Sequence, residues 1–103
     1  MIGSVGSPSH VVDAIDIKGS IKVALALSTS AAESAALTAG VYDVYSDVDS
    51  SIRVAVDNSG VTVANGYTLF ANNVISVVVN NDNDKIGGIL ASGTGNLYYH
   101  KVR

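Results

Sequence analysis

Pairs of acidic residues are the first candidates for chemistry in this sequence. Asp47 and Asp49, followed directly by two serines, begin as a calcium-binding loop begins. Such an EF-hand loop needs glycine at its sixth position and glutamate at its twelfth, where this chain has Ile52 and Asn58. The second pair lies in residues 82–84, where Asp and Asn are typical of a solvated hairpin tip. The sequence therefore predicts turns at both places and no metal site.

Histidine, serine and glycine complete no catalytic or phosphate-binding pattern. His10 and His100 lie near opposite ends of the chain and no cysteine accompanies them, so neither a zinc site nor a thiol nucleophile is predicted. The serines form no G-x-S-x-G elbow. The glycines of residues 93–95 lack the spacing and the following helix of a phosphate loop. We therefore expect no catalytic residue, no cofactor and no enzymatic activity.

The tyrosines are candidates for contacts with a partner. Tyrosine buries its ring while its hydroxyl stays in water, so it recurs at protein interfaces. Tyr98 and Tyr99 are adjacent and must face opposite sides of a strand, which leaves one of them to supply an interface contact. Tyr42 is expected to cap the core instead.

Alternation of apolar and polar side chains is the main signal for the elements that position these residues. Residues 21–27 are apolar at odd positions and residues 51–57 at even ones, as in half-buried strands. Residues 74–79 are apolar on both faces apart from Ser76, which suits a central strand or one whose outer face a partner covers. Further strands are expected over residues 10–17, 41–45, 61–64, 67–71, 86–91 and 96–102.

Turns rich in Gly, Asn and Asp separate these runs at residues 58–60, 65–66, 72–73, 80–84 and 92–95. Short strands with a turn about every 8 to 12 residues predict an all-β fold: a compact antiparallel β-sandwich (jelly-roll-like) or a small barrel. Residues 30–39 are different, because they are rich in alanine. Ser30 with Glu33 fits a helical capping box there, although a small-residue loop or edge segment is favoured.

Composition limits the class of protein. With 48% apolar and 15% charged residues, the 103-residue chain has enough apolar residues for one folded domain and not enough length for two. The six Lys and Arg are scattered and the formal net charge is −3, so no nucleic-acid partner is expected. No apolar run approaches the roughly 20 residues of a membrane helix, and residues 1–9 do not resemble a signal peptide. No membrane partner is expected either.

The N-terminus is expected to lie apart from the core. We interpret residues 1–9 as an arm and residues 10–103 as a single β-sandwich domain, because the arm contains the only proline and has no regular alternation. Its apolar side chains, Ile2 and Val5, could lie across a neighbouring subunit; a frayed end is the alternative.

Three segments of the chain carry a family resemblance. Residues 28–57 read STSAAESAALTAGVYDVYSDVDSSIRVAVD, residues 84–89 read DKIGGI and residues 93–100 read GTGNLYYH. This combination of a Ser/Ala segment, a G-x-Y-x-V-x-S-D-x-D strand pair and a closing glycine turn resembles small virion proteins of tailed bacteriophages. The resemblance covers about the last three quarters of the chain.

The resemblance implies a structural role. We expect a capsid decoration (cement) protein, made in the host cytoplasm, which binds and stabilises the shell of major capsid protein on the virion surface. A homo-oligomer, either dimer or trimer, is expected, with Ile2, Val5, Tyr98 and Tyr99 as the candidate interface. The alternatives are a head–tail or tail component and a β-module that binds host-surface glycans.

Overall fold

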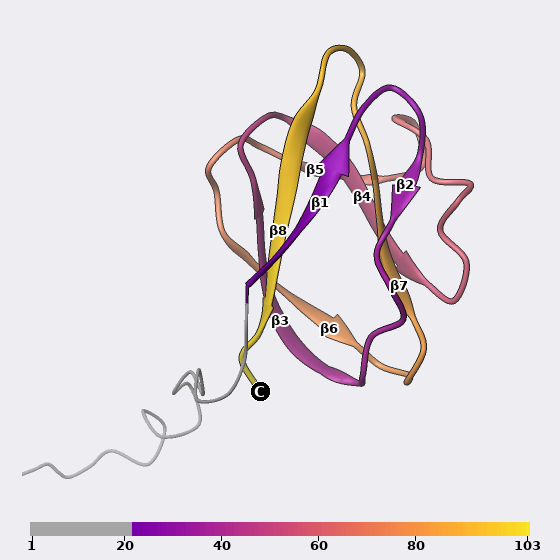
Figure 1. Ribbon diagram of the computed structural model, residues 1–103, viewed down its shortest axis with the longest axis vertical. Coiled ribbons are helices and arrows are strands. Elements are labelled where there is room, and N and C mark those ends of the chain that lie inside the picture. The colour runs from indigo at the N-terminus through magenta and orange to yellow at the C-terminus, as the bar shows by residue number, and fades with distance from the viewer. Residues whose placement is uncertain (1–21) are drawn as a thin grey trace, which may run out of the picture.

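The computed structural model describes residues 22–103, which form eight strands and no helix, and so no helix that could cross a membrane (Figure 1). The strands are β1 (Val23–Leu27), β2 (Ala32–Glu33), β3 (Gly40–Ser46), β4 (Ser50–Ala55), β5 (Tyr67–Leu69), β6 (Ile75–Val79), β7 (Lys85–Ile89) and β8 (Gly95–Lys101). They form two antiparallel four-stranded sheets: sheet A, with the order β1-β8-β3-β6, and sheet B, with the order β2-β7-β4-β5.

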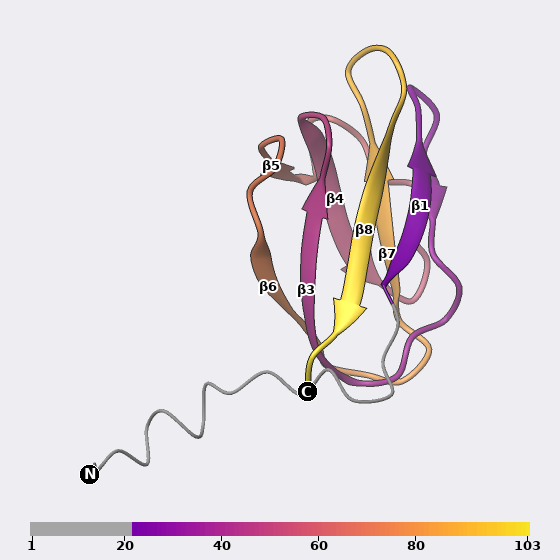
Figure 2. The same ribbon diagram turned by 60° about the vertical axis from the view of Figure 1, so that its left-hand side comes forward.

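The strand pairing is that of a jelly roll. β1 pairs with β8, β2 with β7, β3 with β6 and β4 with β5, as in one long hairpin that has been rolled up. Two further pairings, β3 with β8 and β4 with β7, join these hairpins into sheets. The sheets lie face to face (Figure 2), and within residues 22–103 β1 and β6 are the edges of sheet A and β2 and β5 those of sheet B. The expected antiparallel β-sandwich is therefore confirmed, and the barrel alternative is not observed.

The core lies between the sheets and combines aliphatic side chains with two tyrosines. Inward positions alternate along each strand, so Tyr42 and Val44 of β3 are buried with Leu97 and Tyr99 of β8. The rings of Tyr42 and Tyr99 lie 6.4 Å apart between centroids. The Tyr42 hydroxyl donates a hydrogen bond to the backbone carbonyl of Thr38 (2.8 Å), so Tyr42 closes the core with its polar end satisfied. The cluster is completed by Leu27, Ile52, Leu69, Val79, Ile86 and Leu90.

The structure differs from two of the strand predictions. Within residues 22–103 the run over residues 74–79 is not a central strand, because β6 begins at Ile75 and pairs only with β3, at the edge of sheet A; the alternative of an outer face covered by a partner stays a prediction. Residues 61–64 form no strand. They lie in a loop, in which Val61 is buried. Residues 30–39 contain the short edge strand β2 and no helical turn, as the favoured alternative predicted. The expected arm and the strand over residues 10–17 lie outside the described residues.

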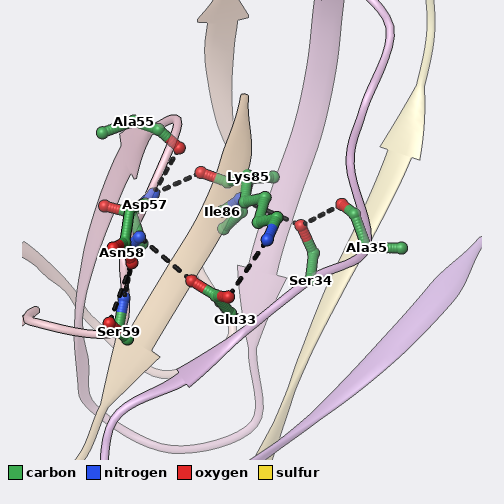
Figure 3. Close-up of polar contacts among 9 residues, drawn as sticks. All are labelled: Glu33, Ser34, Ala35, Ala55, Asp57, Asn58, Ser59, Lys85 and Ile86. Atoms are coloured by element: carbon green, nitrogen blue, oxygen red, sulfur yellow. Dashed lines mark hydrogen bonds and ion pairs between the residues drawn. The ribbon is translucent and has the colours of Figure 1, made fainter. Parts of the chain in front are cut away.

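The loop between β4 and β5, residues 56–66, lies across the outer face of sheet B. Asn58 is fully buried in this loop, and its side-chain amide donates hydrogen bonds to the backbone carbonyls of Ala55 (3.2 Å) and Lys85. Its backbone N–H donates to the Glu33 carboxylate (3.0 Å), which also forms an ion pair with Lys85 (3.2 Å) (Figure 3). Asn58 therefore ties the loop to β2 and β7 together.

A glycine in β7 makes room for this contact. A Cβ atom at Gly87 would lie 2.4 Å from the Cβ of Asn58, closer than two carbons can approach. Glycine weakens a strand interior, and here it marks the place where another part of the chain packs directly on the backbone.

We expect Gly87→Ala to lower the free energy of unfolding by about 1–3 kcal/mol, because the added methyl group displaces Asn58 from its hydrogen bonds. Urea titration of the purified variant measures this loss. The matched control is Gly60→Ala in the same loop, where a Cβ meets no atom within 4 Å and the change should stay within about 0.5 kcal/mol. Equal stability of the two variants would contradict the role given to Asn58.

A second prediction concerns alkaline pH. Burial raises the pKa of the Tyr99 hydroxyl above its ordinary value, an effect that a hydrogen bond with Ser34 partly opposes. The unfolded chain therefore releases this proton at a lower pH than the folded chain, and stability falls as pH rises beyond about 10. Unfolding curves recorded between about pH 8 and pH 11 should show a shallower loss for Tyr99→Phe than for the wild type. Parallel curves would contradict this assignment.

Candidate functional site

The outer face of sheet A brings together exposed and half-buried polar and aromatic side chains of β3, β6 and β8 and of Lys22, which precedes β1. Tyr45 of β3 lies directly opposite Tyr98 of β8, and Asp43 lies opposite His100 one step along the same pair. We call this surface the tyrosine face and define it as Lys22, Asp43, Tyr45, Ser76, Tyr98 and His100. All of these positions have the opposite parity to the buried residues of their strands, so the pleat points them away from the core.

The two tyrosines and Lys22 hold one another in place. The rings of Tyr45 and Tyr98 stack with centroids 5.0 Å apart and planes at 25°. The Lys22 ammonium lies 4.9 Å from the Tyr98 centroid and 5.8 Å from that of Tyr45, and it donates a hydrogen bond to the Tyr45 hydroxyl (3.2 Å). Stacking and cation–π contact together fix the rings before any partner arrives.

The hollow on this face is small. Its volume is about 160 Å³, and its lining residues are Lys22, Asp43, Tyr45, Val74, Tyr98, Tyr99 and His100. Small-molecule sites in proteins usually enclose roughly 300–1,000 Å³. The tyrosine face is therefore better suited to contact with another surface than to enclosing a small ligand.

The predicted interface residues separate into three groups. Tyr98 is half-buried on the tyrosine face, whereas Tyr99 points the other way and is 6% exposed in the core. Tyr99 is therefore corrected to a core residue, because its ring packs in the core cluster beside Tyr42 and has little surface left for a partner. Ile2 and Val5 lie outside the described residues. The sequence does not single out Tyr45 and Lys22 as interface residues, since only the pairing of β8 with β3 on one side and with β1 on the other brings them to Tyr98.

The acidic residues at the turns accept hydrogen bonds from the backbone. Asp47 Oδ1 accepts the N–H of Asn96 (2.8 Å) and Asp49 Oδ1 that of Ala71 (2.9 Å), so each ties one connection to another. Asp82 Oδ1 accepts the N–H of Ala39 (2.8 Å) in the same way. Within residues 22–103, no three side chains among His, Cys, Asp and Glu come together as metal ligands.

Asp57 has a separate, local role. Its Oδ1 accepts hydrogen bonds from the Ser59 hydroxyl (2.8 Å) and from the Ser59 backbone N–H (3.1 Å), and these two bonds lower the pKa of the carboxyl group. The residue closes the turn that begins the loop over sheet B. Its pKa shift therefore reflects turn formation.

Comparisons of the chain with models of protein families, with curated proteins and with solved structures return no match. The assignment of a function accordingly depends on the residues and geometry of this chain.

We expect the melting temperature to be unaffected by EDTA and by added calcium, because the carboxylates of Asp47, Asp49 and Asp82 already accept backbone hydrogen bonds. Differential scanning calorimetry with NaCl of equal ionic strength as the control measures this. A ligand that binds only the folded state raises its stability, so a rise of several degrees with calcium would show a cation site.

Proposed function

We propose that this chain is a non-enzymatic virion structural protein of a tailed bacteriophage, a decoration (cement) protein that binds the shell of major capsid protein through its tyrosine face. The observation that carries the proposal is the Tyr45–Tyr98 stack under Lys22 on the outer face of sheet A, which no other segment of the described residues covers. The resemblance in sequence to small phage virion proteins supports the same role.

Tyrosine is the residue type that gives such a surface its affinity. Tyrosines are enriched among the few residues that dominate binding energy at protein interfaces, where they lie in a desolvated centre. The Tyr45 and Tyr98 rings are already ordered by their mutual contact and by Lys22, so binding costs less side-chain entropy. The charged neighbours Lys22 and Asp43 would orient the partner.

The fold is compatible with this role. Jelly rolls occur in viral capsid domains and also in lectins, so the architecture by itself does not choose between a protein and a sugar partner. A capsid shell presents many equivalent sites, and multivalent attachment there compensates for a small contact area per copy.

A second candidate is a host-surface glycan-binding module that uses the same face. The observation in its favour is the hollow where Tyr98, Asp43 and His100 meet, which offers an aromatic ring beside polar groups. Two features oppose it. The stack and Lys22 cover much of the ring faces on which a sugar would lie, and the chain contains no tryptophan.

The proposal is tested by co-sedimentation with capsids assembled without this chain. We expect Tyr98→Ala to lower the apparent affinity at least about tenfold, since an interface tyrosine of this kind contributes about 2 kcal/mol or more. The control is Phe70→Ala, which removes another exposed aromatic ring next to β5 of sheet B and should bind as the wild type does.

Two results would overturn this function. Equal binding of Tyr98→Ala and wild type would remove the tyrosine face from the contact. Binding to a glycan array together with no binding to capsids would favour the sugar-binding alternative. Counting copies per virion by mass spectrometry separates the locations, because hundreds of copies fit a shell protein and about a dozen fit a tail or neck component.

A further inference from the structure

β6 is an edge strand that lacks the usual protection against pairing with another chain. It pairs with β3 on one side and has no strand on the other side within the described residues. Its sequence, ISVVV, contains no charge and no proline. Natural proteins protect such edges with Lys, Pro, bulges or very short strands, because an open edge offers free backbone N–H and C=O groups to any strand nearby.

The sandwich is also open beside β6. The neighbouring edge strand of sheet B, β5, has three residues and pairs only with Ser50–Ile52, so among the described residues no strand lies beside the second half of β4 on that side. Figure 2 shows β5 and β6 at the same side of the molecule, one above the other. A groove of about 330 Å³ lies there, lined by Ile52, Val54, Tyr67, Ile75 and Val77, with Arg53 among its polar lining residues.

The groove continues past Val54 into a second hollow, which ends in a polar turn. Val56 and Val78 line this hollow together with Asp82 and Asp84. We call the two hollows and the edge of β6 the seam. Val56, Tyr67 and Val78 are 67%, 65% and 58% exposed, so large apolar side chains gather along it. Contiguous apolar surface of this kind usually marks a site of contact.

Charge is distributed unequally along the seam. Arg53 lies at the Ile75 end, and it forms no ion pair within residues 22–103. Asp82 and Asp84 lie at the opposite end, beyond Val78. A surface with opposite charges at its two ends is complementary to a second copy of itself turned through 180°.

We propose that the seam binds a second copy of this chain, with the two β6 strands pairing antiparallel about a twofold axis near Val77. The backbone edges then satisfy each other, and Arg53 of one copy approaches Asp82 and Asp84 of the other. The twofold axis is perpendicular to sheet A, since antiparallel neighbours in one sheet keep their faces on the same side. Two four-stranded sheets become one continuous eight-stranded sheet.

In this dimer the two tyrosine faces lie on the same side. Because the faces of a continuous sheet are shared, the Tyr45–Tyr98 stacks of both copies point to the same side of the dimer. A dimer would then present two identical contacts to one partner surface, which raises the effective concentration of the second contact. The self-association itself goes beyond the proposed function and does not depend on it.

The first test is the oligomeric state of the full chain, measured by sedimentation velocity over a range of concentrations. We expect a dimer for the wild type and a monomer for Val78→Lys, which adds a charge to the open edge at an already exposed position. The control is Val63→Lys in the loop over sheet B, which makes the same change at another exposed valine and should stay dimeric. Circular dichroism and melting temperature show whether each variant is folded.

The second test is a charge exchange. Arg53→Glu alone and Asp84→Lys alone should each weaken the dimer at least about tenfold, and the double variant should recover most of the wild-type affinity. Recovery is expected only if the two residues meet across the interface, so a fold defect in a single variant cannot imitate it.

A wild-type monomer or trimer at all concentrations, a dimer that persists in Val78→Lys, or a double variant no tighter than the single ones would overturn the proposal. If the seam instead binds a strand of a different protein, the wild-type chain alone would remain a monomer at all concentrations. If the dimer is found and capsid binding is not, only the proposed function fails.

Discussion

The pairing of β3 with β8 is the contact on which both faces of sheet A depend. Its register places Val44 opposite Tyr99 on the inner face and Tyr45 opposite Tyr98 on the outer face. Side chains alternate along a strand, so a slip by one residue on β8 would send Tyr99 into solvent and Tyr98 into the core. Val44 and Leu97 are completely buried, which makes such a slip costly. The requirements of the core thereby also determine the position of the tyrosine face.

The two sheets differ in how their outer faces are treated. Sheet B is covered by residues 56–66, and glycine at positions 66 and 87 lets that loop approach the strands closely. Asn58 seals the contact by bonding the backbone of β7 and the carboxylate of Glu33. Sheet A has no such cover within the described residues, so its aromatic side chains remain accessible. Because the outer face of sheet B is covered and that of sheet A is not, we place the binding surface on the outer face of sheet A.

The two surfaces proposed for binding share only Ser76 and have different physical character. The tyrosine face is aromatic and charged and has only a small hollow, which suits a contact with a second kind of protein. The seam is an apolar groove beside an unpaired backbone edge, which suits strand addition. A twofold dimer through the seam leaves both tyrosine faces exposed on one side. The groove of the seam exists because β5 is short. A longer β5 would cover the second half of β4 and close the groove.

Alternation and turn residues were sufficient to predict an all-β sandwich, the strands around Leu25, Val44, Ile52 and Leu97, and the turns between them. They could not decide which strand becomes an edge: the run over residues 74–79 suited a central strand or one whose outer face a partner covers, and β6 has one neighbouring strand within residues 22–103. They also left open which of Tyr98 and Tyr99 faces the core, and they did not join Tyr45 and Lys22 to Tyr98. A period of two tells which side chains share a face of one strand. The neighbours of that strand and the direction of its buried face depend on contacts between residues far apart in the chain, and only the tertiary structure determines those.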